Sequence, residues 1–151
     1  MPEETNQLRV RLVTPERTLF DHPAAAVELP AKNGYMEVLY GHAPLVAELG
    51  AGDVIVHGGE DSKTGGEASG PEGDSRYNVS WGFAEVLGDR VTILASDALK
   101  PEEIDVPRAQ EQLVRGHKQW DEAGDSEDAY TNALRVIAEA EAKIASAAQK
   151  H

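Results

Sequence analysis

Hydrophobic and polar side chains alternate along the first hundred residues with the two-residue period of β-strands. Residues 8–13 alternate apolar and basic positions, which is typical of a strand that buries one face. Similar segments lie at 26–30, 35–40, 53–57, 77–86 and 91–95. Turn-forming residues separate them, among them Lys32-Asn33-Gly34, whose Asn-Gly pair tolerates positive φ angles. Many short strands with regular turns predict a β-sandwich or barrel.

The period lengthens to that of α-helices after Lys100-Pro101. Asp105 stands where it can cap a first helix, and Gly116 together with residues 121–125 is expected to end it. Ser126 can cap a second helix, which carries a narrow apolar stripe among many alanines. Two helices with a short connection predict a helical hairpin. We therefore divide the chain into a β-domain at 1–100 and a helical hairpin at 101–151.

Residues 58–76 interrupt the strand pattern with a stretch rich in glycine and acidic residues. The stretch has no large apolar side chain, so it cannot offset the entropy that ordering would cost. Strand patterns resume directly after it. We therefore expect a flexible loop within the β-domain rather than a linker between two domains.

The charge balance is strongly acidic, with a formal net charge of -13 at pH 7. This argues against nucleic-acid binding, which needs a basic surface, and against direct adsorption to an anionic membrane. No apolar run approaches the roughly 20 residues of a membrane span, and Met1–Thr5 has no signal-peptide character. The chain has no cysteine, which excludes disulfides and fits a reducing compartment. We expect any membrane association to occur through a partner.

Histidines are the most prominent candidates for site chemistry. His42 lies between Gly41 and the Ala43-Pro44 pair, and His57 ends a predicted strand. Neither stands at the spacing of a metal-binding cluster, so we predict no metal site and a structural or contact role for His42. No nucleophile, phosphate-loop or zinc-protease motif is present either. We therefore predict that the chain has no catalytic residues and is not an enzyme.

Other conspicuous residues have simpler interpretations. The aromatic residues are expected to serve in packing: Trp81, Phe83, Trp120 and Tyr130. The segment 103–109 places an acid, a helix start and an arginine within one turn. On spacing alone, Asp105 caps the helix and Arg108 is solvated. The other interpretation is that Arg108 and the helix amino terminus bind an anion or a nucleotide.

Short motifs along the whole chain carry a resemblance to a known family. They are, in order, Val13-Thr14-Pro15-Glu16, Gly41-His42-Ala43-Pro44-Leu45-Val46, Leu49-Gly50-Ala51-Gly52, Gly82-Phe83-Ala84-Glu85-Val86, Val91-Thr92-Ile93-Leu94-Ala95 and Glu102-Glu103-Ile104-Asp105. The chain resembles, from about Leu8 to Gln149, the epsilon subunit of bacterial F-type ATP synthase, called delta in mitochondria. The resemblance implies an α+β protein with an N-terminal antiparallel β-sandwich of about ten strands and a C-terminal α-helical hairpin.

The same resemblance implies a non-catalytic subunit in the central rotor stalk of a proton-translocating ATP synthase. Its partners would be the gamma subunit, the c-ring and the catalytic beta subunit, at the cytoplasmic face of the bacterial inner membrane and attached only through the complex. Contacts with the c-ring and gamma are implied for Asn33, Gly34, Tyr35, Gly41, His42, Ala43, Pro44 and Leu45. The chain departs from the family at Glu37-Val38, which replace a Gly-Ile pair, and at Trp81, which replaces a glycine.

The resemblance gives the helical hairpin a regulatory role. It would switch between a form folded on the sandwich and an extended form that restrains ATP hydrolysis. The cations implied to contact acidic segments of the beta subunit are Arg108, Arg115, Lys118, Arg135 and Lys143. For any one of them taken singly, ordinary helix-surface charge is the simpler interpretation.

Nucleotide binding is the remaining property that the family suggests. Some members bind ATP through a motif that Ile104, Asp105, Arg108 and Ala109 match, with two arginines on the second helix. Here Glu139 and Lys143 stand at those two positions, and an acid repels a triphosphate. We expect weak or absent ATP binding and no other cofactor. The alternative to a rotor subunit is a free-standing β-domain that serves as an adaptor or binds a small ligand, with a helical tail.

Overall fold

The chain forms a curled β-sheet followed by two antiparallel helices, as predicted. The computed structural model describes residues 7–58 and 74–148. The strands are β1 (Leu8–Val13), β2 (Thr18–Ala24), β3 (Ala26–Ala31), β4 (Gly34–Leu39), β5 (Leu45–His57), β6 (Ser75–Val86) and β7 (Arg90–Leu99). A short 3-10 helix, Pro101–Glu103, leads to α1 (Val106–Glu122) and α2 (Glu127–Ala148). The predicted α+β class with a helical hairpin is confirmed.

All strands belong to one sheet with the order β2-β1-β7-β6-β5-β3-β4. Every neighbouring pair is antiparallel except β1 and β7, which run parallel. The described residues hold seven strands rather than about ten, because the long strands bend without breaking. In β5 the bend lies near Gly50–Gly52, where the register with β3 shifts from Glu28↔Ile55 to Ala31↔Leu49.

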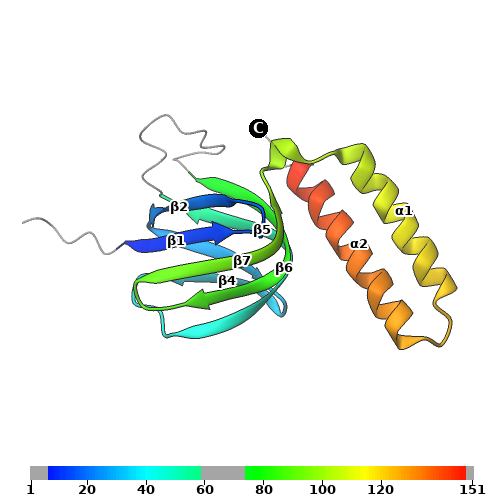
Figure 1. Ribbon diagram of the computed structural model, residues 1–151, viewed down its shortest axis with the longest axis horizontal. Coiled ribbons are helices and arrows are strands. Elements are labelled where there is room, and N and C mark those ends of the chain that lie inside the picture. Colours follow the sequence, from blue (N-terminus) through cyan, green and yellow to red (C-terminus); the bar gives the residue numbers. More distant parts are fainter. Residues whose placement is uncertain (1–6, 59–73, 149–151) are drawn as a thin grey trace, which may run out of the picture.

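The sheet curls on itself (Figure 1), and the described residues inside it form one hydrophobic core. The alternation in β1 is as predicted, with Leu8, Val10 and Leu12 inside and Arg9 and Arg11 outside. The other strands add fully buried side chains that include Val27, Leu29, Val38, Leu49, Val54, Val56, Val79, Val86 and Ile93. Burial of these apolar surfaces holds the sheet closed.

The predicted loop at 58–76 falls largely outside the part of the chain that can be described. Residues 59–73 belong to neither described range. At its far end the prediction was wrong, because Ser75 and Arg76 already pair with β5 as the start of β6. Arg76 has a reason to be ordered: its Nη1 lies 2.8 Å from Oδ2 of the buried Asp53.

The two helices pack closely through small residues. On α1 the buried positions Ala109 and Gly116 and the capping residue Ala123 recur every seven residues. They face α2, where Ala133, Ile137 and Ala140 are buried. A Cβ atom at Gly116 would lie 2.8 Å from Cγ1 of Ile137. Gly116 therefore permits the close approach of the helices, and the prediction that it ends α1 was wrong.

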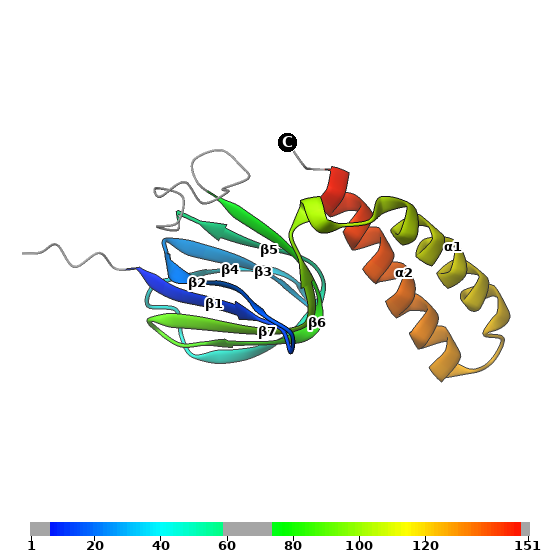
Figure 2. The same cartoon turned by 45° about the horizontal axis from the view of Figure 1, so that its top comes forward.

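The predicted helix caps are confirmed. The backbone N–H of Arg108 donates to Oδ1 of Asp105 at 3.1 Å, and that of Ala129 donates to Oγ of Ser126 at 3.2 Å. Strand β7 ends at Leu99, and the helical segment begins at Pro101. Helix α2 lies between α1 and the sheet (Figure 2), and it makes the main contacts of the hairpin with β5 and β6.

Candidate functional site

Two successive residues with positive φ in β6 position an aromatic side chain against the helical hairpin. Trp81 has φ 57 and Gly82 has φ 131. The pairing with β5 keeps one register on both sides of them, with Ser80 opposite Ala51 and Gly82 opposite Leu49. A Cβ atom at Gly82 would collide with the carbonyl of Leu94, so only glycine fits beside this tryptophan.

Helix α2 contacts Trp81 and the neighbouring Ser80 through polar side chains. The indole Nε1 of Trp81 donates to Oε2 of Glu139 at 3.0 Å. The guanidinium of Arg135 stacks on the indole ring, 4.3 Å from its centroid. One turn beyond Glu139, Nζ of Lys143 lies 3.4 Å from Oγ of Ser80 and 3.4 Å from Oε1 of Glu139. The contact between α2 and β6 therefore includes specific hydrogen bonds and charges.

A second contact holds the segment that joins the two domains. The guanidinium of Arg17 donates to both carboxylate oxygens of Glu103, at 2.8 and 3.2 Å. The same carboxylate accepts from the backbone N–H of Lys100 at 2.8 Å. The hydrogen bonds from Arg17 and then from Lys100 lower the pKa of Glu103. The hydrogen bond to Glu103 likewise raises the pKa of Arg17.

Between these two contacts lies a cavity of about 380 Å³. It is lined by Asp97, Leu99, Glu103, Asp105, Arg108, Ala109, Gln112, Glu139 and Lys143. The structure thus brings most of the predicted nucleotide residues together with Glu139 and Lys143, while Ile104 is buried beside them. Four carboxylates and two cations line this space, so its electrostatics disfavour a polyphosphate.

Comparison with known proteins gives the family. A model of the family described as ATP synthase, Delta/Epsilon chain, beta-sandwich domain matches residues 7–101. An ATP synthase epsilon chain of Koribacter versatilis is 42% identical over 75% of this chain and 71% of its own length. One of Solibacter usitatus is 36% identical over 95% of this chain and 97% of its own. The chain belongs to the ATP synthase delta/epsilon family.

A solved structure of similar fold spans both parts of the chain. It is a chain in the Euglena gracilis mitochondrial ATP synthase, OSCP/F1/c-ring, in rotational state 1. Its TM-score is 0.73 at 23% identity, and the match covers 93% of this chain and 81% of that chain. Within the described residues, neither helix is long and apolar enough to span a bilayer. These comparisons give no support to a free-standing adaptor.

The structure does not gather the cations for which the resemblance implied inhibitory contacts. Arg108, Arg115 and Lys118 are exposed on α1. Arg135 and Lys143 instead face the sandwich, where Trp81 and Ser80 hold them. The Lys143 side chain is only 12% exposed. In this folded form two of the candidate cations are therefore engaged within the epsilon-family chain itself.

The implied c-ring and gamma contact set is also divided. Asn33, Gly34 and Tyr35 lie at the β3–β4 turn, where Tyr35 lines a cavity together with Ala142 and Ala145 of α2. Gly41–Leu45 follow the other end of β4, and the backbone N–H of Gly41 donates to the carbonyl of Gly88 in the β6–β7 turn. The five steps of β4 at about 3.3 Å each separate the two groups by roughly 17 Å. A flat partner surface at one end of β4 therefore contacts only one of these two groups of residues.

Two aromatic interpretations need correction. Phe83 is 55% exposed on the outer face of β6, beside the exposed Leu94 of β7 with which it pairs. Trp120 and Tyr130 are exposed near the tip of the hairpin, where their rings contact each other with centroids 6.1 Å apart. Phe83 faces outward because it stands one residue from the buried Ala84, on the opposite side of the strand.

Sequence reasoning missed the residues on the sandwich side of the site. Arg17, Ser80 and Asp97 belong to no motif that indicates their contacts with the hairpin segment. For Trp81 the sequence indicates only a packing role. It also missed the cluster of Glu28, Glu37 and His57, whose side chains converge from three strands. The spacing of the histidines along the chain predicts no metal site, because it does not show which strands are neighbours. The Lys32-Asn33 turn would have placed Glu28 opposite Glu37, but nothing local in the sequence indicates that His57 joins them.

Proposed function

We propose that this chain is a central-stalk subunit of a proton-translocating F-type ATP synthase, without an active site of its own. It is peripheral at the cytoplasmic face of a bacterial membrane, bound through the gamma subunit and the c-ring. Its hairpin restrains ATP hydrolysis by the beta subunit when it leaves the sandwich. The family match supports the subunit assignment, and the polar contact of Arg135 and Lys143 with the sandwich is the observation that carries the proposed role of the hairpin.

That contact suits a reversible attachment. Domains that separate during function meet through modest and polar interfaces, and here Trp81, Glu139 and Lys143 supply the specific bonds. Release of α2 breaks these bonds and frees Arg135 and Lys143 for contacts with acidic segments of a partner. A partner that binds only the released form shifts the population toward it. The folded form described here is then the non-inhibiting one.

The outer surface of the sandwich offers separate contacts for the rotor. We assign the c-ring contact to Gly41–Leu45, because the β3–β4 turn at Asn33–Tyr35 lies beside α2. The exposed apolar side chains Val46, Phe83 and Leu94 suit the gamma subunit, since apolar patches of this kind mark protein interfaces. The two partners then bind different faces of the same domain.

ATP binding is proposed to be weak or absent. Asp97, Glu103, Asp105 and Glu139 outnumber Arg108 and Lys143 around the cavity at the base of the hairpin. Asp105 is also engaged in capping α1. Calorimetric titration of the full chain with MgATP tests this, and an affinity tighter than about 1 mM would contradict it.

The regulatory role is tested with the complex reconstituted from its subunits. The shortened chain ends at Ile104, so that Arg17 and Glu103 keep their ion pair. We expect it to bind the complex and support synthesis, but to allow faster ATP hydrolysis than the full chain. Full-length variants that reverse the charges of Arg115 and Lys118 should give hydrolysis rates between those of the full and the shortened chain. Equal hydrolysis rates with the full and the shortened chain would refute inhibition by the hairpin, and failure of either chain to bind would refute the subunit assignment.

A further inference from the structure

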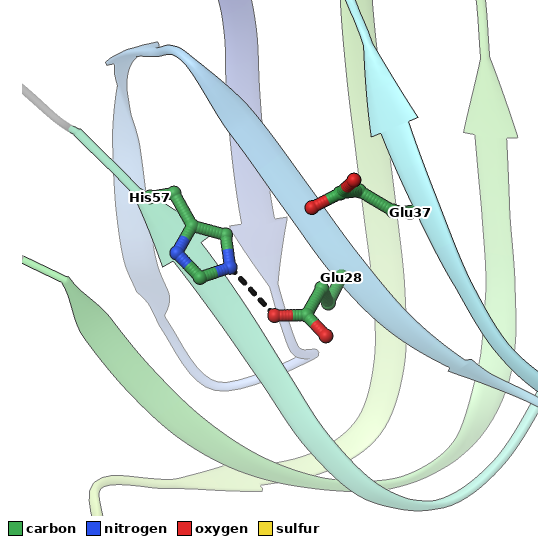
Figure 3. A group of neighbouring side chains, drawn as sticks. All are labelled: Glu28, Glu37 and His57. Atoms are coloured by element: carbon green, nitrogen blue, oxygen red, sulfur yellow. Dashed lines mark hydrogen bonds and ion pairs between the residues drawn. The ribbon is translucent and has the colours of Figure 1, made fainter.

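Three side chains with metal-binding atoms converge on the outer face of the sheet. Glu28 of β3, Glu37 of β4 and His57 of β5 each offer one ligand atom, and these atoms all lie within 4.8 Å of one another. Figure 3 shows the imidazole directed toward the Glu28 carboxylate, with Glu37 on the neighbouring strand. Nε2 of His57 lies 2.6 Å from Oε2 of Glu28. The three side chains belong to three adjacent strands.

The sheet register forces two like charges together. Glu28 and Glu37 are direct partners in the antiparallel β3–β4 pair. Acidic side chains directly opposite each other destabilise a strand pair unless a cation lies between them. Glu37 has no salt bridge among the residues that the structure describes. This pair therefore gains more from a shared cation than an isolated surface glutamate does.

The imidazole is held in the orientation that metal-binding histidines have. Its Nδ1 lies 2.9 Å from Oδ2 of Asp74, on the side away from Glu28. A carboxylate on one ring nitrogen fixes the tautomer and directs the other nitrogen at the metal. The His57 side chain is 30% exposed and that of Asp74 is 32% exposed, so the group is open to solvent ions. Asp74 thus gives a second observation, independent of the two glutamates.

We propose that Glu28, Glu37 and His57 bind one divalent transition-metal ion of the zinc class, with Asp74 as the positioning residue for His57. One imidazole and two carboxylates suit Zn²⁺, whereas Mg²⁺ and Ca²⁺ prefer oxygen ligands alone. The ion replaces the proton that His57 shares with Glu28, and water completes its coordination. Its two charges offset the repulsion between Glu28 and Glu37.

The geometry requires only small movements of flexible side chains. Zinc bonds of about 2.0–2.1 Å place tetrahedral ligand atoms roughly 3.3 Å apart. The His57–Glu28 contact at 2.6 Å opens slightly, and the other separations, at most 4.8 Å, close by up to about 1.5 Å. Rotation about the side-chain bonds of glutamates at the protein surface provides this range.

Metal binding here has a structural consequence for the sandwich. Among the strands that the structure describes, β4 is the last in the sheet order and pairs only with β3. An ion held by Glu37 joins this edge strand both to β3 and, through His57, to β5. Because β4 leads directly into Gly41–Leu45, the ion would also restrain that connection. We therefore expect zinc to raise the thermal stability of the chain.

The test uses the full chain, freed of metal with a chelator and titrated with ZnCl₂ by calorimetry and thermal unfolding. We expect one Zn²⁺ per chain with a dissociation constant on the order of 1–10 μM. MgCl₂ should bind at least about 100-fold more weakly. Asp74→Asn should weaken zinc binding by about 10–100-fold. Absence of one-to-one zinc binding below about 100 μM would overturn the proposal.

Glu37→Gln gives the sharpest variant, because its two effects have opposite signs. It should raise the melting temperature of the metal-free chain by removing the like-charge pair, and weaken zinc binding at least tenfold. His57→Gln should abolish binding, with His117→Gln on α1 and Glu85→Gln on β6 as matched controls that leave it unchanged. Zinc binding that survives His57→Gln, or that His117→Gln removes, would assign the ion to another histidine and refute the site.

Discussion

Replacement of Trp81 by alanine should release the helical hairpin from the sandwich. The indole makes two contacts with α2: the hydrogen bond to Glu139 at 3.0 Å and the cation-π contact with Arg135 at 4.3 Å. A hydrogen bond to a charged group contributes about 1.5–3 kcal/mol, and its lower end applies because Glu139 is partly exposed. An exposed cation-π contact adds about 0.5–1 kcal/mol. The docked form should therefore lose about 2 kcal/mol.

A loss of about 2 kcal/mol lowers the ratio of docked to released hairpin roughly thirtyfold. The absence of cysteine allows this ratio to be measured with a single introduced pair. Cysteines at Ser96 and Thr131, which line the same cavity between sandwich and α2, can be joined by a short thiol cross-linker when the hairpin is docked. In the reconstituted complex the same substitution should deepen inhibition of ATP hydrolysis.

Two further variants separate the contacts. Trp81→Phe removes the indole donor but keeps an aromatic ring for Arg135, so its effect should lie between those of wild type and alanine. Trp120→Phe near the hairpin tip is the matched control, because Trp120 contacts Tyr130 rather than the sheet. If Trp81→Ala leaves both the cross-linking yield and the hydrolysis rate within twofold of wild type, the polar contact at Trp81 does not hold the hairpin.

The other predictions concern stability. The lowered pKa of Glu103 means that its ion pair with Arg17 stabilises the fold above the unfolded pKa of about 4.5, and that this stabilisation is lost as pH falls through the folded pKa. Glu103→Gln should therefore reduce the difference in unfolding free energy between pH 6 and pH 3 by up to about 1 kcal/mol, measured by urea unfolding at both pH values. Gly82→Ala should cost about 3 kcal/mol in chemical denaturation, because a positive φ and a backbone collision act together, and a stable variant would contradict the backbone conformation described at Gly82. Gly116→Leu should force the helices apart against Ile137 and lower the hairpin's melting temperature; unchanged melting would place that glycine outside the interface.

The polar contact and the proposed zinc site lie on different parts of the same sheet. One depends on the positive φ of Trp81 in β6 and the other on the register of β3, β4 and β5. The variants that test them are therefore independent: Trp81→Ala should leave zinc affinity unchanged, and Glu37→Gln should leave hairpin docking unchanged. Distant sites without shared partners normally behave additively.

Local features of the sequence determined the class of fold and the ends of several elements. Alternation in β1 is expressed in its own side chains, because a strand points successive residues to opposite faces. Asp105 and Ser126 cap their helices through bonds that reach only three residues along the chain. Prediction of these features needed no knowledge of distant segments. The failure at Gly116 shows the limit of local reasoning, since its role depends on Ile137 of the other helix.

Only the tertiary structure decided which distant side chains meet. His57 reaches Glu28 because β5 pairs with β3, and Trp81, at a point of positive φ in β6, reaches Glu139 because α2 packs against that strand. It also decided that the Asn33–Tyr35 end of β4 lies beside α2, whereas Gly41 at the other end lies beside Gly88 of the β6–β7 turn. The physical reason is that the amino-acid pattern fixes which face of each strand is buried, whereas pairing partners and bends depend on how all the strands share one core.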